Sequence, residues 1–125
     1  MKKVQKKRIL ILTGTRAEYG YIKHILKLIE KSPKLEYRLV ISGTHLEKKY
    51  GSSINEIKKD GFKHTTSVYV KSIPKDPVMW SQLIGDSIIK ISKVFNKIKP
   101  DLILIPGDPW IIFASAIAAT YMKIP

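Results

Sequence analysis

Polar side chains capable of binding or catalysis occur where three hydrophobic runs of the sequence end. Gly14-Thr15-Arg16 follows one run, Ser42-Gly43-Thr44-His45 follows another, and Gly107-Asp108 follows a third. If the runs are parallel strands, their carboxyl ends lie at one edge of a sheet, where open α/β proteins bind ligands. The sequence therefore predicts a single site assembled from these loops.

The segment around Gly14 and Arg16 is suited to an anion. Glycine permits a tight turn and a close approach of the backbone, and the helix that follows offers free amides and the positive end of its dipole. Arg16 adds a fixed cation with a forked geometry, so Gly14 and Arg16 are candidate binding residues for a phosphate or diphosphate. The segment is neither a Walker loop nor a Gly-x-Gly-x-x-Gly fingerprint. The alternative is a capped helix with an exposed arginine.

Asp108 and His45 are the other candidates. A carboxylate just after a buried strand can act as a base, hold a ribose or bind a metal, which makes Asp108 the candidate catalytic residue. Equally, Asp108 can cap the last helix, with Pro109 in its first turn. His45 is either a contact for a base or sugar or an ordinary loop histidine. Histidines and carboxylates show no metal-ligand spacing, so we expect neither a metal site nor a cofactor.

The elements that position these residues alternate between strands and helices. Hydrophobic patterning predicts strands over 8–13, 35–42, 64–70 and 102–105, and helices over 15–31, 53–59, 78–99 and 110–122. This alternation predicts an α/β fold with a Rossmann-like parallel sheet, strand order 3-2-1-4 and helices on both faces. Ile124-Pro125 is expected to begin a further strand beside the fourth.

Two helix starts carry the spacing of a capping box. Thr15 precedes Glu18 by three residues, and Ser53 precedes Glu56 by the same distance. In such a box the hydroxyl and the carboxylate each accept a hydrogen bond from an otherwise free backbone amide. We therefore expect both hydroxyls to act as helix caps.

Composition limits the class of protein. The chain has 125 residues, 44% of them hydrophobic, which suits one globular domain. Its formal charge is +13, but lysine supplies most of it and recurs at helical spacing, so we expect solvated helix faces and not a nucleic-acid site. No run approaches the ~20 apolar residues of a membrane helix, so we expect no membrane partner. Without cysteine, disulfide scaffolds, thiolate zinc sites and cysteine nucleophiles are excluded, and a cytoplasmic location is expected.

Several blocks of the sequence resemble the hydrolysing UDP-N-acetylglucosamine 2-epimerases of the sialic and legionaminic acid branch. The blocks occur in the family's order and span nearly the whole chain. They are Ile11 to Gly20, Ser42 to Leu46, Tyr50-Gly51, Ile57 to Phe62, Lys99 to Leu104, Gly107-Asp108, Ala116 to Ala119 and Ile124-Pro125.

The resemblance implies a fold and a reaction. Family members have two Rossmann-like domains in a GT-B-like arrangement, with the site in the cleft, so residues 1–125 are expected to be the first part of the N-terminal domain. The family's reaction removes the C2 proton, eliminates UDP to give a 2-acetamidoglucal, and adds water to yield N-acetylmannosamine. By resemblance, Arg16 lies on the diphosphate side, Asp108 is the catalytic carboxylate and His45 lies near the substrate.

The sequence also departs from the family pattern. After Gly-Asp, hydrolysing members usually continue with arginine, an aromatic residue and glutamate, whereas this chain has Pro109, Trp110 and Ile111. The family's later His-x-His-Gly-Gly-Glu segment would start beyond Pro125. We therefore expect no turnover by the isolated chain, and a non-catalytic nucleotide-binding or interaction module is the alternative. An uncovered fourth strand predicts self-association or a homo-oligomer.

Overall fold

The computed structural model describes residues 3–51, 53–70, 73–107 and 109–125. Strands and helices alternate along the chain, as the hydrophobic pattern predicts. In chain order the elements are β1 (Lys7–Thr13), α1 (Arg16–Glu30), β2 (Leu35–Ile41), α2 (Ile54–Lys59), β3 (Thr65–Ser67), α3 (Pro77–Ile98), β4 (Leu102–Leu104) and α4 (Trp110–Tyr121). Two short 3₁₀ helices, η1 (Gly43–Leu46) and η2 (Lys48–Tyr50), lie between β2 and α2.

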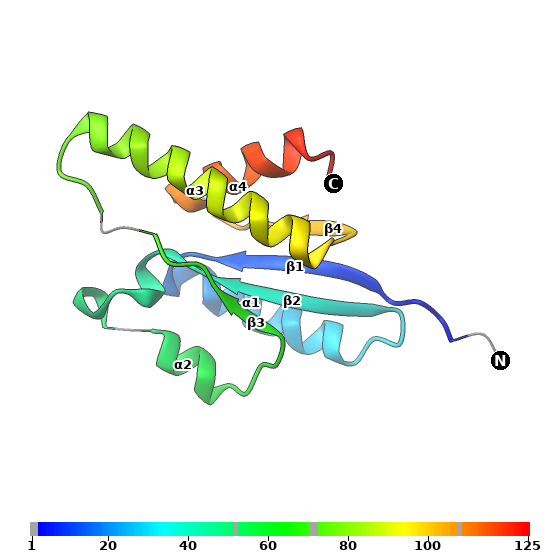
Figure 1. The fold of residues 1–125 in the computed structure, drawn as a ribbon. Helices are drawn as coiled ribbons and strands as arrows, with labels where there is room; N and C mark the ends of the chain where they lie inside the picture. Colours follow the sequence, from blue (N-terminus) through cyan, green and yellow to red (C-terminus); the bar gives the residue numbers. More distant parts are fainter. Residues whose placement is uncertain (1–2, 52, 71–72, 108) are drawn as a thin grey trace.

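The strands form one sheet in the order β3-β2-β1-β4, and every neighbouring pair is parallel. Helices α1 and α2 lie on one face of this sheet, and α3 and α4 cover the other (Figure 1). Strand β1 is central, since Ile9 is in register with both Tyr37 of β2 and Leu102 of β4. The predicted Rossmann-like fold and its strand order are therefore confirmed.

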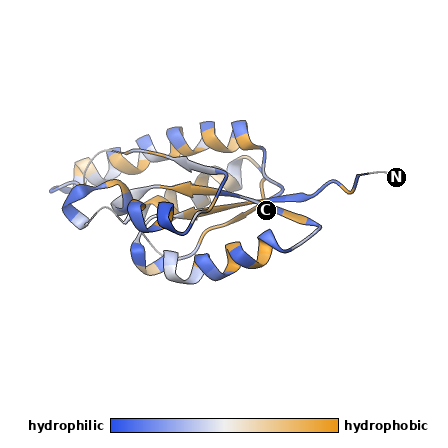
Figure 2. Ribbon diagram, turned by 90° about the horizontal axis from the view of Figure 1, so that it is seen from below, coloured by the Kyte–Doolittle hydropathy of each residue, from blue (hydrophilic) through white to orange (hydrophobic). Residues whose placement is uncertain are grey.

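Two hydrophobic layers hold the sheet between the helices. Leu10 and Leu12 of β1 pack with Ile91 and Phe95 of α3, whereas Ile11 packs with the residues of α1. Because β1 is buried on both faces, its sequence is a continuous apolar run and not an alternating one. Figure 2 shows the hydrophobic strands in the interior and helices that carry both hydrophobic and hydrophilic residues.

Strand β3 is shorter than the predicted 64–70. It spans only Thr65–Ser67, because His64 has φ 59° and so lies in the left-handed region, outside strand geometry. Although Val68 N–H still donates to the Ile41 carbonyl at 2.8 Å, the chain leaves the ladder there. The other element boundaries lie within one or two residues of the predicted positions.

Both predicted hydroxyl caps are wrong. Thr15 makes no side-chain capping bond, and Glu18 accepts from the amide of Gly14, one residue before the expected partner. Ser53 does not cap α2 because its hydroxyl is hydrogen-bonded to the His45 ring. At Ser53 a contact with the His45 ring competes with the cap, whereas at Glu18 a different local bond, to the Gly14 amide, replaces the expected one.

The outer side of β4 makes a contact with the end of the chain. Ile103 N–H donates to the Pro125 carbonyl at 2.8 Å, on the side of β4 that faces away from β1. This is the position at which the sequence predicts a further strand to begin. Across the described ranges, no helix combines the length and the apolar character needed to span a membrane.

Candidate functional site

The carboxyl ends of β1 and β2 are joined by two glycines. Gly43 has φ +63°, and a Cβ added there would lie 2.5 Å from the Gly14 carbonyl oxygen. That carbonyl accepts from the Thr44 amide at 2.9 Å and from the Thr44 hydroxyl at 3.2 Å. Two loops that the sequence predicts to share one edge are therefore in direct backbone contact.

Gly14 is also in close contact with α4, on the other side of the sheet. Its Cβ position lies 2.6 Å from Cγ2 of Ile111, and its amide donates to Oε2 of the buried Glu18 at 2.9 Å. Gly107, at φ +82°, approaches the same carboxylate, with Glu18 Oε1 2.8 Å from its Cβ position. Side chains larger than hydrogen at either glycine would displace Glu18 or Ile111, so close packing explains the glycines at this edge.

His45 is fully buried at this edge. Its Nε2 lies 2.8 Å from the Thr13 hydroxyl, and its Nδ1 lies 2.6 Å from the Ser53 hydroxyl. Thr13 in turn donates to the Thr15 carbonyl at 3.4 Å, so these bonds are satisfied when Nε2 carries the proton and Nδ1 accepts from Ser53. Burial lowers the pKa of His45 to about 4, which keeps the ring neutral. The ring thus connects the end of β1 to the start of α2.

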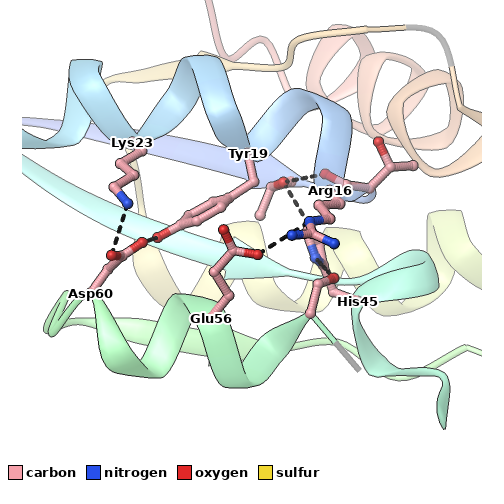
Figure 3. A network of polar contacts seen from close by, with 9 residues as sticks. Arg16, Tyr19, Lys23, His45, Glu56 and Asp60 are labelled. Atoms are coloured by element: carbon pink, nitrogen blue, oxygen red, sulfur yellow. Dashed lines mark hydrogen bonds and ion pairs between the residues drawn. The ribbon is translucent and has the colours of Figure 1, made fainter. Parts of the chain in front are cut away.

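Arg16 begins α1 and projects into solvent, with 78% of its side chain exposed. Its Nε lies 3.3 Å from Oε2 of Glu56, which comes from α2. The predicted site residues Gly14, Arg16 and His45 therefore come from adjacent loops of one edge, and Figure 3 shows Arg16 and His45 together. Asp108 lies outside the described residues.

A second polar cluster links α1 to α2 and is not predicted from the sequence. The Tyr19 hydroxyl donates to Asp60 Oδ2 at 2.7 Å, and Lys23 Nζ lies 2.9 Å from Oδ1 of the same carboxylate (Figure 3). Lys23, then Tyr19, lowers the pKa of Asp60, while burial and Asp60 together raise the pKa of Tyr19. Helical spacing puts Tyr19 and Lys23 on one face of α1, but no local pattern links them to Asp60, which is 41 and 37 residues away.

Comparison with known proteins identifies the family. The family model for UDP-N-acetylglucosamine 2-epimerase matches residues 27–125. The chain belongs to the UDP-N-acetylglucosamine 2-epimerase family. A UDP-N,N'-diacetylbacillosamine 2-epimerase (hydrolyzing) from Legionella pneumophila is 33% identical over 95% of this chain and 32% of its own length. A UDP-N-acetylglucosamine 2-epimerase from Neisseria meningitidis serogroup B is 37% identical over 82% of this chain and 26% of its own length.

Solved structures of other proteins have the same fold. The N. meningitidis UDP-GlcNAc 2-epimerase, solved with UDP-GlcNAc, superposes with a TM-score of 0.77 at 22% identity, over 94% of this chain and 30% of that one. The S. aureus protein MnaA, solved with UDP, gives a TM-score of 0.74 at 26% identity, over 95% of this chain and 29% of that one. The chain thus spans about a third of the length of the curated epimerases that it matches.

The departure from the family pattern has a structural counterpart. Ile111, where the resemblance leads us to expect a glutamate, is fully buried and packs against Gly14. The position is part of the hydrophobic core between β1 and α4. The described part of the chain contains no group of three or more His, Asp or Glu residues that could hold a metal ion.

Proposed function

We propose that this chain forms the nucleotide-diphosphate side of the site of a hydrolysing UDP-N-acetylglucosamine 2-epimerase, and that residues 1–125 are part of its N-terminal Rossmann-like domain. The observation that carries the proposal is the exposed Arg16 guanidinium at the start of α1, beside the packed glycine Gly14. A cation next to free helix amides suits a diphosphate. Family membership and a relative solved with UDP support the same ligand.

In the proposed reaction, a base of the enzyme accepts the C2 proton of the sugar, a C1–C2 double bond forms, and UDP departs from C1 with the bonding electrons, which gives a 2-acetamidoglucal. Addition of water then yields N-acetylmannosamine, so UDP-N-acetylglucosamine and water become N-acetylmannosamine and UDP. Arg16 would stabilise the negative charge that develops on the diphosphate leaving group. The names of the relatives leave two sugars to compare, N-acetylglucosamine and N,N'-diacetylbacillosamine.

Asp108 and His45 have different places in this proposal. Asp108 stays our prediction for the catalytic carboxylate, on the strength of its Gly-Asp context. The assignment of His45 to substrate contact also stays a prediction, but its two hydroxyl partners support a positioning role. In that role the ring holds the Gly43 loop against Gly14, while the substrate contacts neighbouring backbone. A cytoplasmic location is also part of the proposal.

Calorimetric titration of the chain with UDP tests the proposal. We expect binding that weakens at least tenfold in Arg16→Gln, because a charge-assisted contact to phosphate is lost. Lys93→Gln is the matched control, since it removes one exposed cation from α3 on the opposite face of the sheet. Equal losses in both variants, or no binding by the wild type, would contradict the proposal. We also expect no release of UDP from UDP-N-acetylglucosamine by this chain alone.

The buried Ile111 favours a second candidate function, a nucleotide-binding module without catalysis. An apolar residue at that position can neither transfer a proton nor bind a sugar hydroxyl. The two functions differ when the chain is mixed with the C-terminal part of a family member. Restored release of UDP would support the epimerase, whereas UDP binding without turnover would support the module.

A further inference from the structure

The faces of α1 and α2 that meet beside the proposed site carry complementary charges. Arg16 and Lys23 lie seven residues apart on α1, and they face Glu56 in α2 and Asp60, the C-cap residue four positions later. Residues at these spacings project from the same side of a helix. The two ion pairs therefore lie side by side in register along one helix interface (Figure 3).

The two pairs differ in their surroundings. Around Asp60, the Lys23 and Asp60 side chains are only 30% and 19% exposed, and the Tyr19 hydroxyl adds a second bond. Around Glu56, by contrast, the pair is open to water, with Arg16 78% and Glu56 43% exposed. The Asp60 contacts therefore fix α2 to α1, whereas the Arg16–Glu56 pair can open without disturbing the core.

The start of α2 is fixed as well. Ser53, just before α2, is held by His45 at 2.6 Å, and Ile57 in the middle of the helix is buried. Glu56 lies between Ser53 and Asp60 and is followed by the buried Ile57, so its backbone is held on both sides. The carboxylate is thus placed beside Arg16 by the fold itself, as a built-in anion for that guanidinium.

We propose that the Glu56 carboxylate is paired with the Arg16 guanidinium in the ligand-free protein, and that the diphosphate of the nucleotide displaces it when the nucleotide binds to Arg16. The proposal rests on the proposed function of Arg16. A diphosphate carries more negative charge than one carboxylate, and a solvent-exposed ion pair is weak. The diphosphate therefore binds Arg16 in preference to Glu56. A ligand with little negative charge does not displace Glu56, and the pair thereby contributes to selection for nucleotide diphosphates.

Removal of the competing carboxylate should tighten ligand binding. We expect Glu56→Gln to bind UDP and inorganic pyrophosphate about two- to fivefold more tightly than the wild type, the range that corresponds to an exposed ion pair. Asp86→Asn is the matched control, because it removes one carboxylate from an exposed ion pair with Lys90 on the opposite face of the sheet. In the Arg16→Gln background, Glu56→Gln should leave the affinity unchanged.

Three calorimetric results would overturn the proposal: weaker or unchanged binding by Glu56→Gln, an equal gain in Asp86→Asn, or a gain that persists without Arg16. NMR of the Arg16 Nε–Hε group separates this proposal from the proposed function. In the free chain its signal should shift in Glu56→Gln and not in Asp86→Asn, and an unchanged signal overturns the pairing. If the signal shifts while neither probe binds the wild type, the proposed function and the competition fail together, and only the ion pair stands.

Discussion

Gly14 is the residue at which the packing of the proposed site is tightest. We expect Gly14→Ala to destabilise the fold by about 1–3 kcal/mol, because the added methyl group would lie 2.6 Å from Ile111 Cγ2 inside the core. Urea unfolding measures this loss. Gly20→Ala is the control within α1, since its Cβ meets nothing within 4 Å, and it should stabilise the helix by about 0.5–1 kcal/mol. Equal effects at both glycines would contradict the packing argument.

The buried ring of His45 makes stability depend on pH. Burial lowers its pKa from 6.5 to about 4, so between these values the unfolded chain binds more protons than the folded one. Stability is therefore complete above about pH 6.5 and falls by about 2 kcal/mol as the pH decreases to about 4.5. Denaturant unfolding across this range should show the slope in the wild type and in His24→Gln, whose parent side chain is exposed, but not in His45→Gln.

At this scale the sequence indicates which residues gather but not what they contact. Strand ends and glycines place Gly14, Arg16 and His45 at one edge, because parallel topology requires it. The partners of His45 are different, since Thr13 and Ser53 are 32 and 8 residues away and meet it only in the fold. No local pattern separates an exposed loop histidine from this fully buried one.

At the scale of elements, Asp60 couples α2 to α1. Tyr19→Phe removes one hydrogen bond to this carboxylate, worth about 1 kcal/mol, so we expect hydrogen exchange in α2 to accelerate about fivefold. Tyr21→Phe is the control, because Tyr21 is exposed on the same helix. Unchanged exchange in α2, or the same acceleration in both variants, would show that other contacts hold this helix.

Elements with strong hydrophobic periodicity are predictable, and short ones defined by tertiary contacts are not. Helix α3 and strand β1 match their predicted ranges closely, because many residues repeat the same pattern. Strand β3 does not, since its three residues are all exposed and depend on β2 for pairing. The cap at Ser53 fails for a related reason, because its hydroxyl is hydrogen-bonded to the buried His45 ring.

For the whole molecule, exposed apolar side chains on α3 and α4 predict self-association. Large exposed examples are Ile89, Phe113 and Tyr121, on the face of the sheet opposite α1 and α2. We expect sedimentation velocity to show association that increases with concentration and weakens several-fold in Phe113→Lys. Leu28→Lys is the control, because Leu28 is equally exposed on α1. A monomer at every concentration would contradict this prediction.

Because β1 is central, its two neighbouring strands become available for pairing at different times during synthesis. One neighbouring strand, β2, follows within the first third of the chain. The Arg8 amide, however, donates to the Asp101 carboxylate, which is synthesised 93 residues later. At ribosomal speeds of roughly 5–20 residues per second, that interval lasts about 5–20 seconds. Throughout it, one hydrogen-bonding edge of the central strand has no native partner. The growing chain is therefore most vulnerable to mispairing before β4 emerges, and a chaperone that covers this edge would act in that interval.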